Sequence, residues 1–180
     1  AKHVPGWCGL IVVIDFLLEA FERYDTNEAM IWDGTPCSYK SLLEATHSCI
    51  ERFSDLAGSV VSLDGDYTPQ TISALLALIE LRCVVVPLAP EARSQKSELH
   101  KIAQVQKAID TEIQDLGTEV DHPLIRKLLD DGTPGLILFS SGTSGERKAI
   151  VHNALRLIEK YRTPRRAKCT IPFMLFDHIG

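Results

Sequence analysis

Apolar residues recur at helical spacing in three stretches of the first half of the chain. Residues 9–24 place one set on a single helix face: Leu10, Val13, Ile14, Leu17, Leu18 and Phe21. A second stripe runs through residues 38–53, where Ser38 is suited to cap the helix N-terminus. A third helix is predicted over residues 68–81, with Thr68 as N-cap and Pro69 at its first position. It is apolar around much of its circumference, so we expect it to be buried on more than one side.

Short apolar runs between and after these helices predict strands at residues 29–32, 59–63, 84–88, 108–113 and 135–139. Asp33 and Gly34 form a turn after the first of them. The apolar run from Val84 to Leu88 begins with three consecutive β-branched valines, which is typical of an interior parallel strand. Further helices are expected at residues 94–106 and 123–129. This alternation predicts an α/β fold in one unit, residues 1–180, with a mostly parallel β-sheet flanked by helices.

The composition is that of a globular domain, with 180 residues of which 45% are hydrophobic. The formal net charge of −5 is unevenly spread: residues 1–145 carry 11 basic and 21 acidic side chains, and residues 146–180 carry 8 and 3. The basic end either attracts an anionic ligand or is a solvated helix face and loop. We do not expect nucleic acid as a partner, because the chain is acidic and has no aromatic-basic motif.

The five cysteines are odd in number and lack C-x-x-C spacing, which argues against a disulfide framework and against a zinc site. We therefore expect a reducing, cytoplasmic location. The apolar run at residues 9–18 is interrupted by Asp15 and is too short to span a bilayer. It also lacks a cleavage site for a signal peptide. We therefore predict neither a signal peptide nor a membrane span.

A glycine- and hydroxyl-rich loop follows the predicted strand at residues 135–139. Its residues are Ser140, Ser141, Gly142, Thr143, Ser144 and Gly145, and Lys148 lies three positions further on. The glycines allow backbone N–H groups to approach an anion, the hydroxyls add donors, and the lysine adds positive charge. An ordinary turn is the alternative interpretation. The spacing differs from that of a nucleotide-triphosphatase loop, and the dinucleotide fingerprint is absent.

Residues 140–148 resemble the signature loop of the adenylate-forming superfamily, which includes acyl-CoA synthetases, fatty-acyl-AMP ligases, luciferases and peptide-synthetase adenylation domains. This chain has Ser144, Arg147 and Ala149 where that loop usually has threonine, proline and glycine. A second segment, residues 172–180, resembles the superfamily's next motif, whose histidine would be His178. Residues 32–43 and 75–88 are similar to earlier segments of the same superfamily, so the resemblance covers most of the chain.

This resemblance implies a ligase in which a carboxylate attacks the α-phosphorus of ATP, with Mg²⁺, to give an acyl-adenylate and pyrophosphate. The acyl group then passes to CoA or to the thiol of a carrier protein. By the resemblance, the loop from Ser140 to Gly145 binds the β- and γ-phosphates, Lys148 supports them electrostatically, and His178 lies at the junction of the acyl and adenylate sites. Most residues that would select the carboxylic acid substrate lie beyond Gly180.

Members of the superfamily are much longer than this chain. We therefore expect an N-terminal fragment of such a ligase, inactive without the missing remainder of the enzyme. Two alternatives remain: a non-catalytic partial domain that assembles with a separately encoded remainder, or an unrelated phosphate-binding α/β protein. His178 has its own alternative as an ordinary histidine at a strand end. Asp64 and Asp66 resemble metal ligands in type, but a turn and a helix start explain them better.

Overall fold

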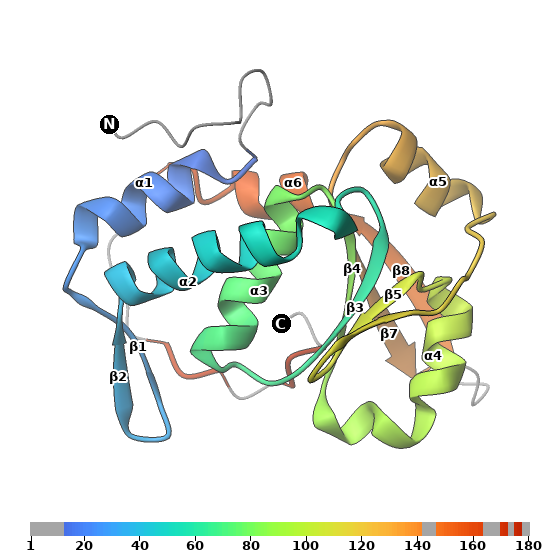
Figure 1. Cartoon of the computed structure of the whole chain (residues 1–180), viewed down its shortest axis with the longest axis horizontal. Coiled ribbons are helices and arrows are strands. Elements are labelled where there is room, and N and C mark those ends of the chain that lie inside the picture. Colours follow the sequence, from blue (N-terminus) through green and yellow to red (C-terminus); the bar gives the residue numbers. More distant parts are fainter. Residues whose placement is uncertain (1–12, 142–146, 164–169, 173–174, 178–180) are drawn as a thin grey trace.

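The computed structural model describes residues 13–141, 147–163, 170–172 and 175–177. In this part of the chain, a sheet with the strand order β6-β5-β3-β4-β7-β8 is covered by helices on both faces, and a two-stranded hairpin stands apart from it (Figure 1). The helices are α1 (Asp15–Tyr24), α2 (Tyr39–Arg52), α3 (Pro69–Glu80), α4 (Lys96–Ala103), α5 (Pro123–Asp130) and α6 (Ala154–Glu159), with short 3-10 helices η1 (Ser54–Leu56) and η2 (Pro90–Gln95). The strands are β1 (Glu28–Trp32), β2 (Thr35–Ser38), β3 (Val60–Asp64), β4 (Val84–Leu88), β5 (Lys107–Ile109), β6 (Ile113–Asp115), β7 (Gly135–Ser141) and β8 (Arg147–Asn153).

The predicted fold class is confirmed, and the sheet is mixed. Strands β5, β3, β4 and β7 run parallel, while β6 and β8 are antiparallel at the two edges. Val84, Val85 and Val86 are fully buried in β4, as expected for an interior parallel strand. The carboxyl ends of the four parallel strands therefore meet at one edge of the sheet, where ligands bind in open α/β sheets.

Two helix N-termini form as predicted. The Ser38 side chain accepts a hydrogen bond from the backbone N–H of Ser41 at 3.2 Å, and the Thr68 side chain accepts one from Thr71 at 3.0 Å. Pro69 occupies the first turn of α3, where its missing N–H is not needed. These caps satisfy backbone donors that no helical carbonyl can reach, so both helix starts are fixed by local sequence.

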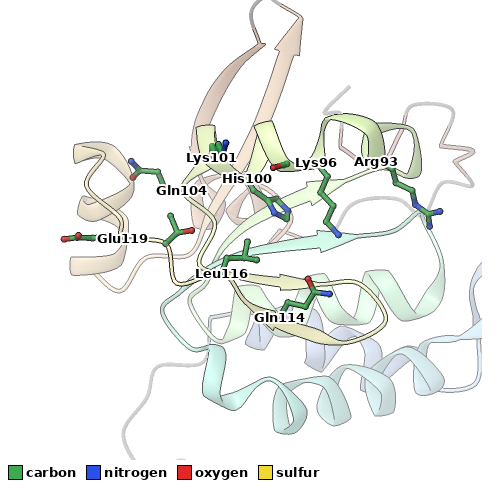
Figure 2. Close-up of a pocket in the computed structure, with 10 residues that line it drawn as sticks. Arg93, Lys96, His100, Lys101, Gln104, Gln114, Leu116 and Glu119 are labelled. Carbon is green, nitrogen blue, oxygen red and sulfur yellow. The ribbon is translucent and has the colours of Figure 1, made fainter.

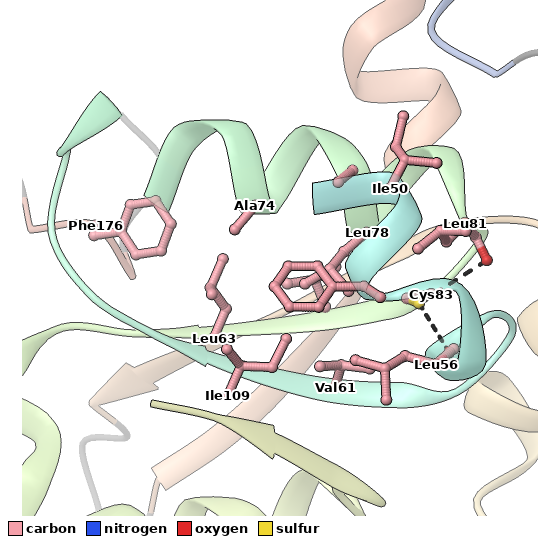
Figure 3. Close-up of a cluster of buried hydrophobic side chains, with 13 residues drawn as sticks. Ile50, Leu56, Val61, Leu63, Ala74, Leu78, Leu81, Cys83, Ile109 and Phe176 are labelled. Atoms are coloured by element: carbon pink, nitrogen blue, oxygen red, sulfur yellow. Dashed lines mark hydrogen bonds between the residues drawn. The ribbon is translucent and has the colours of Figure 1, made fainter. Parts of the chain in front are cut away.

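The two faces of the sheet are packed against different helices. Val61, Leu63 and Val85 face the cluster that includes α2, α3 and Phe176 (Figure 3). The alternate residues Val60, Val84 and Val86 face the cluster that includes residues of α4 and α5, such as Leu99 and Ile125. Helix α3 contributes to the first cluster and to a third one with the residues before α1, which confirms that it is buried on more than one side. We call these two sides of the sheet the α3 face and the α4 face.

The first helix is shorter than the apolar pattern predicts. Residues 1–12 lie outside the described part of the chain, and α1 begins at Asp15. Val13 and Ile14 precede it and are buried against Ile79 of α3. Their backbone N–H groups both donate to the Glu80 carboxylate, at 2.9 and 3.0 Å. A side chain from α3 thus satisfies donors at the start of α1.

Two predictions about the second half of the chain were wrong in detail, and one strand was not predicted. The helix expected at residues 94–106 is divided into η2 and the shorter α4. The strand expected at residues 108–113 is two short antiparallel strands, β5 and β6, because the chain turns at Asp110, whose N–H donates to the Glu112 carbonyl at 3.3 Å. The sequence interpretation did not include β8, whose polar residues hide its β pattern.

Candidate active site

The predicted phosphate loop joins β7 to β8 at the carboxyl edge of the sheet. Ser140 and Ser141 are the last residues of β7, while Gly142, Thr143, Ser144 and Gly145 lie outside the described residues. The two strands pair in register, with Ser140 opposite Lys148 and Ser141 opposite Arg147. Residues opposite one another in an antiparallel pair project to the same face of the sheet. The structure therefore brings together two of the predicted phosphate-binding residues from either side of the loop.

The orientation of these two residues follows from the alternation along the hairpin. Phe139 and Ala149 pack against the α4-face cluster, and they are paired with each other. Because side chains alternate along a strand, Ser140 and Lys148 project from the α3 face. Ser140 is half-buried and Lys148 is exposed. A cation that is exposed at the rim of a loop can approach a ligand without first losing a buried partner.

Part of the second motif lies at the same edge. His178 lies outside the described residues, but Leu175, Phe176 and Asp177 precede it directly. Phe176 is buried in the α3-face cluster (Figure 3). Tyr67 packs against its ring. Tyr67 follows β3 by three residues, so it stands at the carboxyl end of a parallel strand. The described start of the second motif and the flanks of the phosphate loop therefore share one edge and one face of the sheet.

Asp64, the last residue of β3, and Asp66, two residues further on, each have a hydrogen-bonding or ionic partner. Asp66 accepts a hydrogen bond from the backbone N–H of Tyr67 at 2.7 Å, and Asp64 pairs with Lys96 at 2.7 Å. Within the described residues, no group of three or more His, Cys, Asp or Glu side chains is arranged to hold a metal ion. The contact of Asp66 is local, as expected for a turn residue, whereas Asp64 ends β3 and pairs with a residue of α4.

Sequence reasoning missed Lys96, which links α4 to two strand ends. Its ammonium lies 2.7 Å from the carboxylate of Asp64, the last residue of β3, and 3.7 Å from that of Asp110, which follows β5. The Lys96 side chain is 24% exposed and that of Asp64 only 15%. A lysine in the first turn of a polar helix gives no local signal of such a role, since its partners are distant in sequence.

A cavity of about 740 Å³ lies on the α4 face, away from the predicted phosphate residues. Lys96 and His100 extend from α4 toward the strands there, with Gln114 and Leu116 on the opposite wall (Figure 2). Burial and the nearby Lys96 charge lower the pKa of His100, which favours its neutral form. Lys96 itself is already paired with two carboxylates, those of Asp64 and Asp110.

Among the comparisons with known proteins, the one with solved structures agrees with this fold. No protein-family model matches the sequence, and no curated protein matches it. Among solved structures, the N-terminal subdomain of Klebsiella oxytoca NpsA in complex with 3-hydroxyanthranilyl-AMSN is similar with a TM-score of 0.59 and 21% identity, over 79% of this chain and 40% of that chain. VinN in complex with L-aspartate is similar with a TM-score of 0.60 and 15% identity, over 82% of this chain and 49% of that chain.

A third similar structure is an artificially fused adenylation-PCP di-domain, NpsA-ThdA from Klebsiella oxytoca, with a TM-score of 0.58 and 22% identity over 79% of this chain and 32% of that chain. At these identities the likeness establishes the fold alone. The chain therefore has the α/β fold of the N-terminal subdomain of an adenylation domain. It spans less than half of the length of each of these three solved chains.

The described residues also show whether a helix could span a membrane and in which state their cysteines are. None of their helices has the length and apolar character that crossing a membrane would need. Cys37, Cys49 and Cys83 are free thiols. Burial raises the pKa of Cys83 to about 12, so this thiol is fully protonated at neutral pH.

Proposed function

We propose that this chain is the N-terminal part of an ATP-dependent ligase that activates a carboxylic acid as its acyl-adenylate. The observation that carries the proposal is the register of the β7–β8 hairpin. It places Ser140 opposite Lys148 at the carboxyl edge of a sheet whose fold is that of adenylation-domain N-terminal subdomains. The sequence between these two residues has the composition of a phosphate-binding loop.

The residues of this chain have separate parts in the proposed reaction. ATP is a substrate, and its β- and γ-phosphates would be held by the Ser140 hydroxyl and by the backbone and hydroxyls of residues 141–145. Lys148 would oppose the negative charge that remains on the pyrophosphate as it leaves. Such transfer depends on positioning and charge stabilisation more than on acid-base chemistry. Mg²⁺ is implied by the resemblance, with the phosphates as its ligands.

The acid and the acceptor belong to the same proposal. The similar structures are named for complexes with 3-hydroxyanthranilyl-AMSN and with L-aspartate, and for a fusion to a PCP. We propose a carboxylic acid as substrate, and CoA or a carrier-protein thiol as acceptor. His178 is assigned to the junction of the acyl and adenylate sites. The remainder of the enzyme is needed as well, since this chain spans less than half of the length of each similar chain.

The decisive assay is pyrophosphate exchange, run on the protein that carries this chain with a panel of aryl, acyl and amino acids. Exchange that depends on one class of acid supports the proposal. Lys148→Ala should lower the rate about 10²- to 10³-fold, the usual effect of removing one group that stabilises developing charge. Lys127→Ala is the matched control, because Lys127 is exposed on α5 and pairs with Asp131. Equal rates for the two variants would remove Lys148 from the site.

A mixing experiment and the Lys148→Ala variant separate the ligase from the two alternatives, a partial domain with a separately encoded remainder and an unrelated phosphate-binding protein. A separately encoded remainder would restore exchange when mixed with residues 1–180, whereas neither part alone would be active. An unrelated phosphate-binding protein would bind inorganic phosphate or ATP with no dependence on any carboxylic acid. If Lys148→Ala lost this binding while the wild-type protein showed no acid-dependent exchange, the ligase proposal would be overturned. The assignment of residues 140–148 as a phosphate-binding loop would remain.

A further inference from the structure

The turn between β3 and α3 is held from both faces of the sheet. On the α4 face, Asp64 pairs with Lys96 at 2.7 Å. At the turn itself, the Gly65 N–H donates to the Leu88 carbonyl at 3.0 Å, and a Cβ at Gly65 would lie 2.6 Å from the Thr71 hydroxyl oxygen. The backbone thus approaches the start of α3 as closely as a glycine allows. This makes the turn a fixed platform at the carboxyl edge.

Tyr67 extends from this platform to the described part of the second motif. Its hydroxyl donates to the Leu175 carbonyl at 3.4 Å, and its ring meets that of Phe176 edge-to-face, with 5.6 Å between centroids and 86° between planes. Phe176 is 6% exposed and belongs to the α3-face cluster. Burial, Asp66 and Asp177 raise the pKa of Tyr67, so its hydroxyl remains a donor across the neutral range.

We propose that Tyr67 is a positioning residue that fixes residues 175–177 at the carboxyl edge of the sheet, on the face shared with Ser140 and Lys148. The phenol combines the two contacts that this needs, a donor for a main-chain carbonyl and an aromatic edge for Phe176. The functional part of this inference rests on the proposed ligase, in which residues 175–177 lead into the acyl site.

A role in positioning has a different kinetic signature from a role in phosphate binding. Tyr67 contacts the second motif, while the predicted phosphate residues belong to the β7–β8 hairpin. Tyr67→Ala should therefore raise KM for the carboxylic acid and leave KM for ATP unchanged. An edge-to-face aromatic pair stabilises by an amount equal to about a 2- to 10-fold change in an equilibrium constant. We expect a rise in KM of that size, and a smaller one for Tyr67→Phe.

Chymotrypsin cleavage after Phe176 tests the positioning without using activity. Because Phe176 is buried, cleavage requires residues 175–177 to leave the sheet, and its rate follows the open population when opening is fast. Tyr67→Ala should speed this cut about 2- to 10-fold, and Tyr67→Phe, which keeps the ring, about 2-fold. Cleavage after Phe53, which is 3% exposed in the same cluster, reports general unfolding and should not change.

Tyr161→Phe is the matched control, because Tyr161 is 55% exposed and loses the same hydroxyl. Wild-type cleavage after Phe176 in both Tyr67 variants would overturn the positioning, whatever the enzyme's activity. Faster cleavage with an unchanged carboxylate KM would overturn its functional part. If no acid of the panel supports pyrophosphate exchange by the wild-type protein, the ligase proposal fails. The cleavage rates still decide whether Tyr67 holds residues 175–177 in place.

Discussion

The Glu80 carboxylate gives the sharpest test of how the N-terminal part is attached. Glu80 is 7% exposed, and one of its oxygens accepts hydrogen bonds from the N–H groups of Val13 and Ile14. Val13 is 6% exposed and Ile14 is fully buried, so water cannot readily replace this acceptor. Glu80→Ala leaves two buried donors unsatisfied, each of which costs about 1–3 kcal/mol. We expect the free energy of unfolding to fall by about 2–4 kcal/mol after partial relaxation.

Glu80→Gln separates hydrogen bonding from charge. The amide oxygen can accept the same two N–H groups, so at pH 7 this variant should lose no more than about 1 kcal/mol. Burial raises the pKa of Glu80 above its ordinary value, although the Ile14 and Val13 N–H groups oppose the rise. The folded state therefore holds this proton more tightly than the unfolded chain does. The corresponding stability is fully present below the unfolded pKa and is lost as the pH rises through the raised folded pKa.

Urea unfolding of wild type, Glu80→Ala and Glu80→Gln between pH 4 and pH 7 measures both effects. Since Glu80→Gln has no carboxyl at this position, its stability relative to wild type should improve as the pH rises across that window. Glu51→Gln, at an exposed position on α2, is the control for loss of a carboxylate. The reasoning is refuted if Glu80→Gln is as damaging as Glu80→Ala at pH 7, or if its difference from wild type does not change with pH.

Three further predictions follow from the core and from the link at Lys96. Gly135→Ala should lower the free energy of unfolding by about 1–3 kcal/mol in urea titrations, because its Cβ would lie 2.7 Å from a Leu128 methyl; wild-type stability would contradict this packing. Lys96→Met should lower the free energy of unfolding by about 1–3 kcal/mol, because it leaves the Asp64 carboxylate unpaired, and adding Asp64→Asn should recover part of that loss. If the effects of the two substitutions were strictly additive, the pair would not interact. Cys83, whose pKa is raised to about 12, should react with iodoacetamide at pH 8 at least about 10³-fold more slowly in the folded than in the unfolded protein. Mass spectrometry of the peptide that contains Cys83 measures both rates, and equal rates would contradict the burial of this thiol.

The parts of the fold that depend on local sequence were predicted well. Ser38 and Thr68 cap their helices through contacts three residues away, and Pro69 adds a preference that needs no distant partner. The β4 strand was equally clear, because an apolar run that begins with three consecutive valines is typical of a strand buried on both faces. Such features can be predicted from the sequence alone, because the residues that interact are close together along the chain.

The parts that depend on distant contacts were missed. Tyr67 hydrogen-bonds to a residue 108 positions away, and Glu80 to residues 66 and 67 positions away. Near each of them the sequence shows only a turn or a helix end. Strand β8 was missed because its residues include Arg147, Lys148, His152 and Asn153, which are typical of an edge strand and weaken the β pattern. For the candidate site, the placement of Ser140 and Ser141 at the end of a strand was predicted correctly, whereas the roles assigned to residues 140–145, Lys148 and His178 remain proposals.

The β7–β8 hairpin has a consequence for how the site would select its ligand. In many phosphate sites the loop leads into a helix, and the helix dipole supplies a fixed partial positive charge that salt screens only in part. Here the next described element after the loop is a strand, β8, and sheets have little net dipole. Selection of an anion would then depend on Lys148, whose charge is on an exposed side chain rather than in the backbone. Nucleotide affinity should therefore fall steeply between low and physiological ionic strength, where the screening length is about 8 Å.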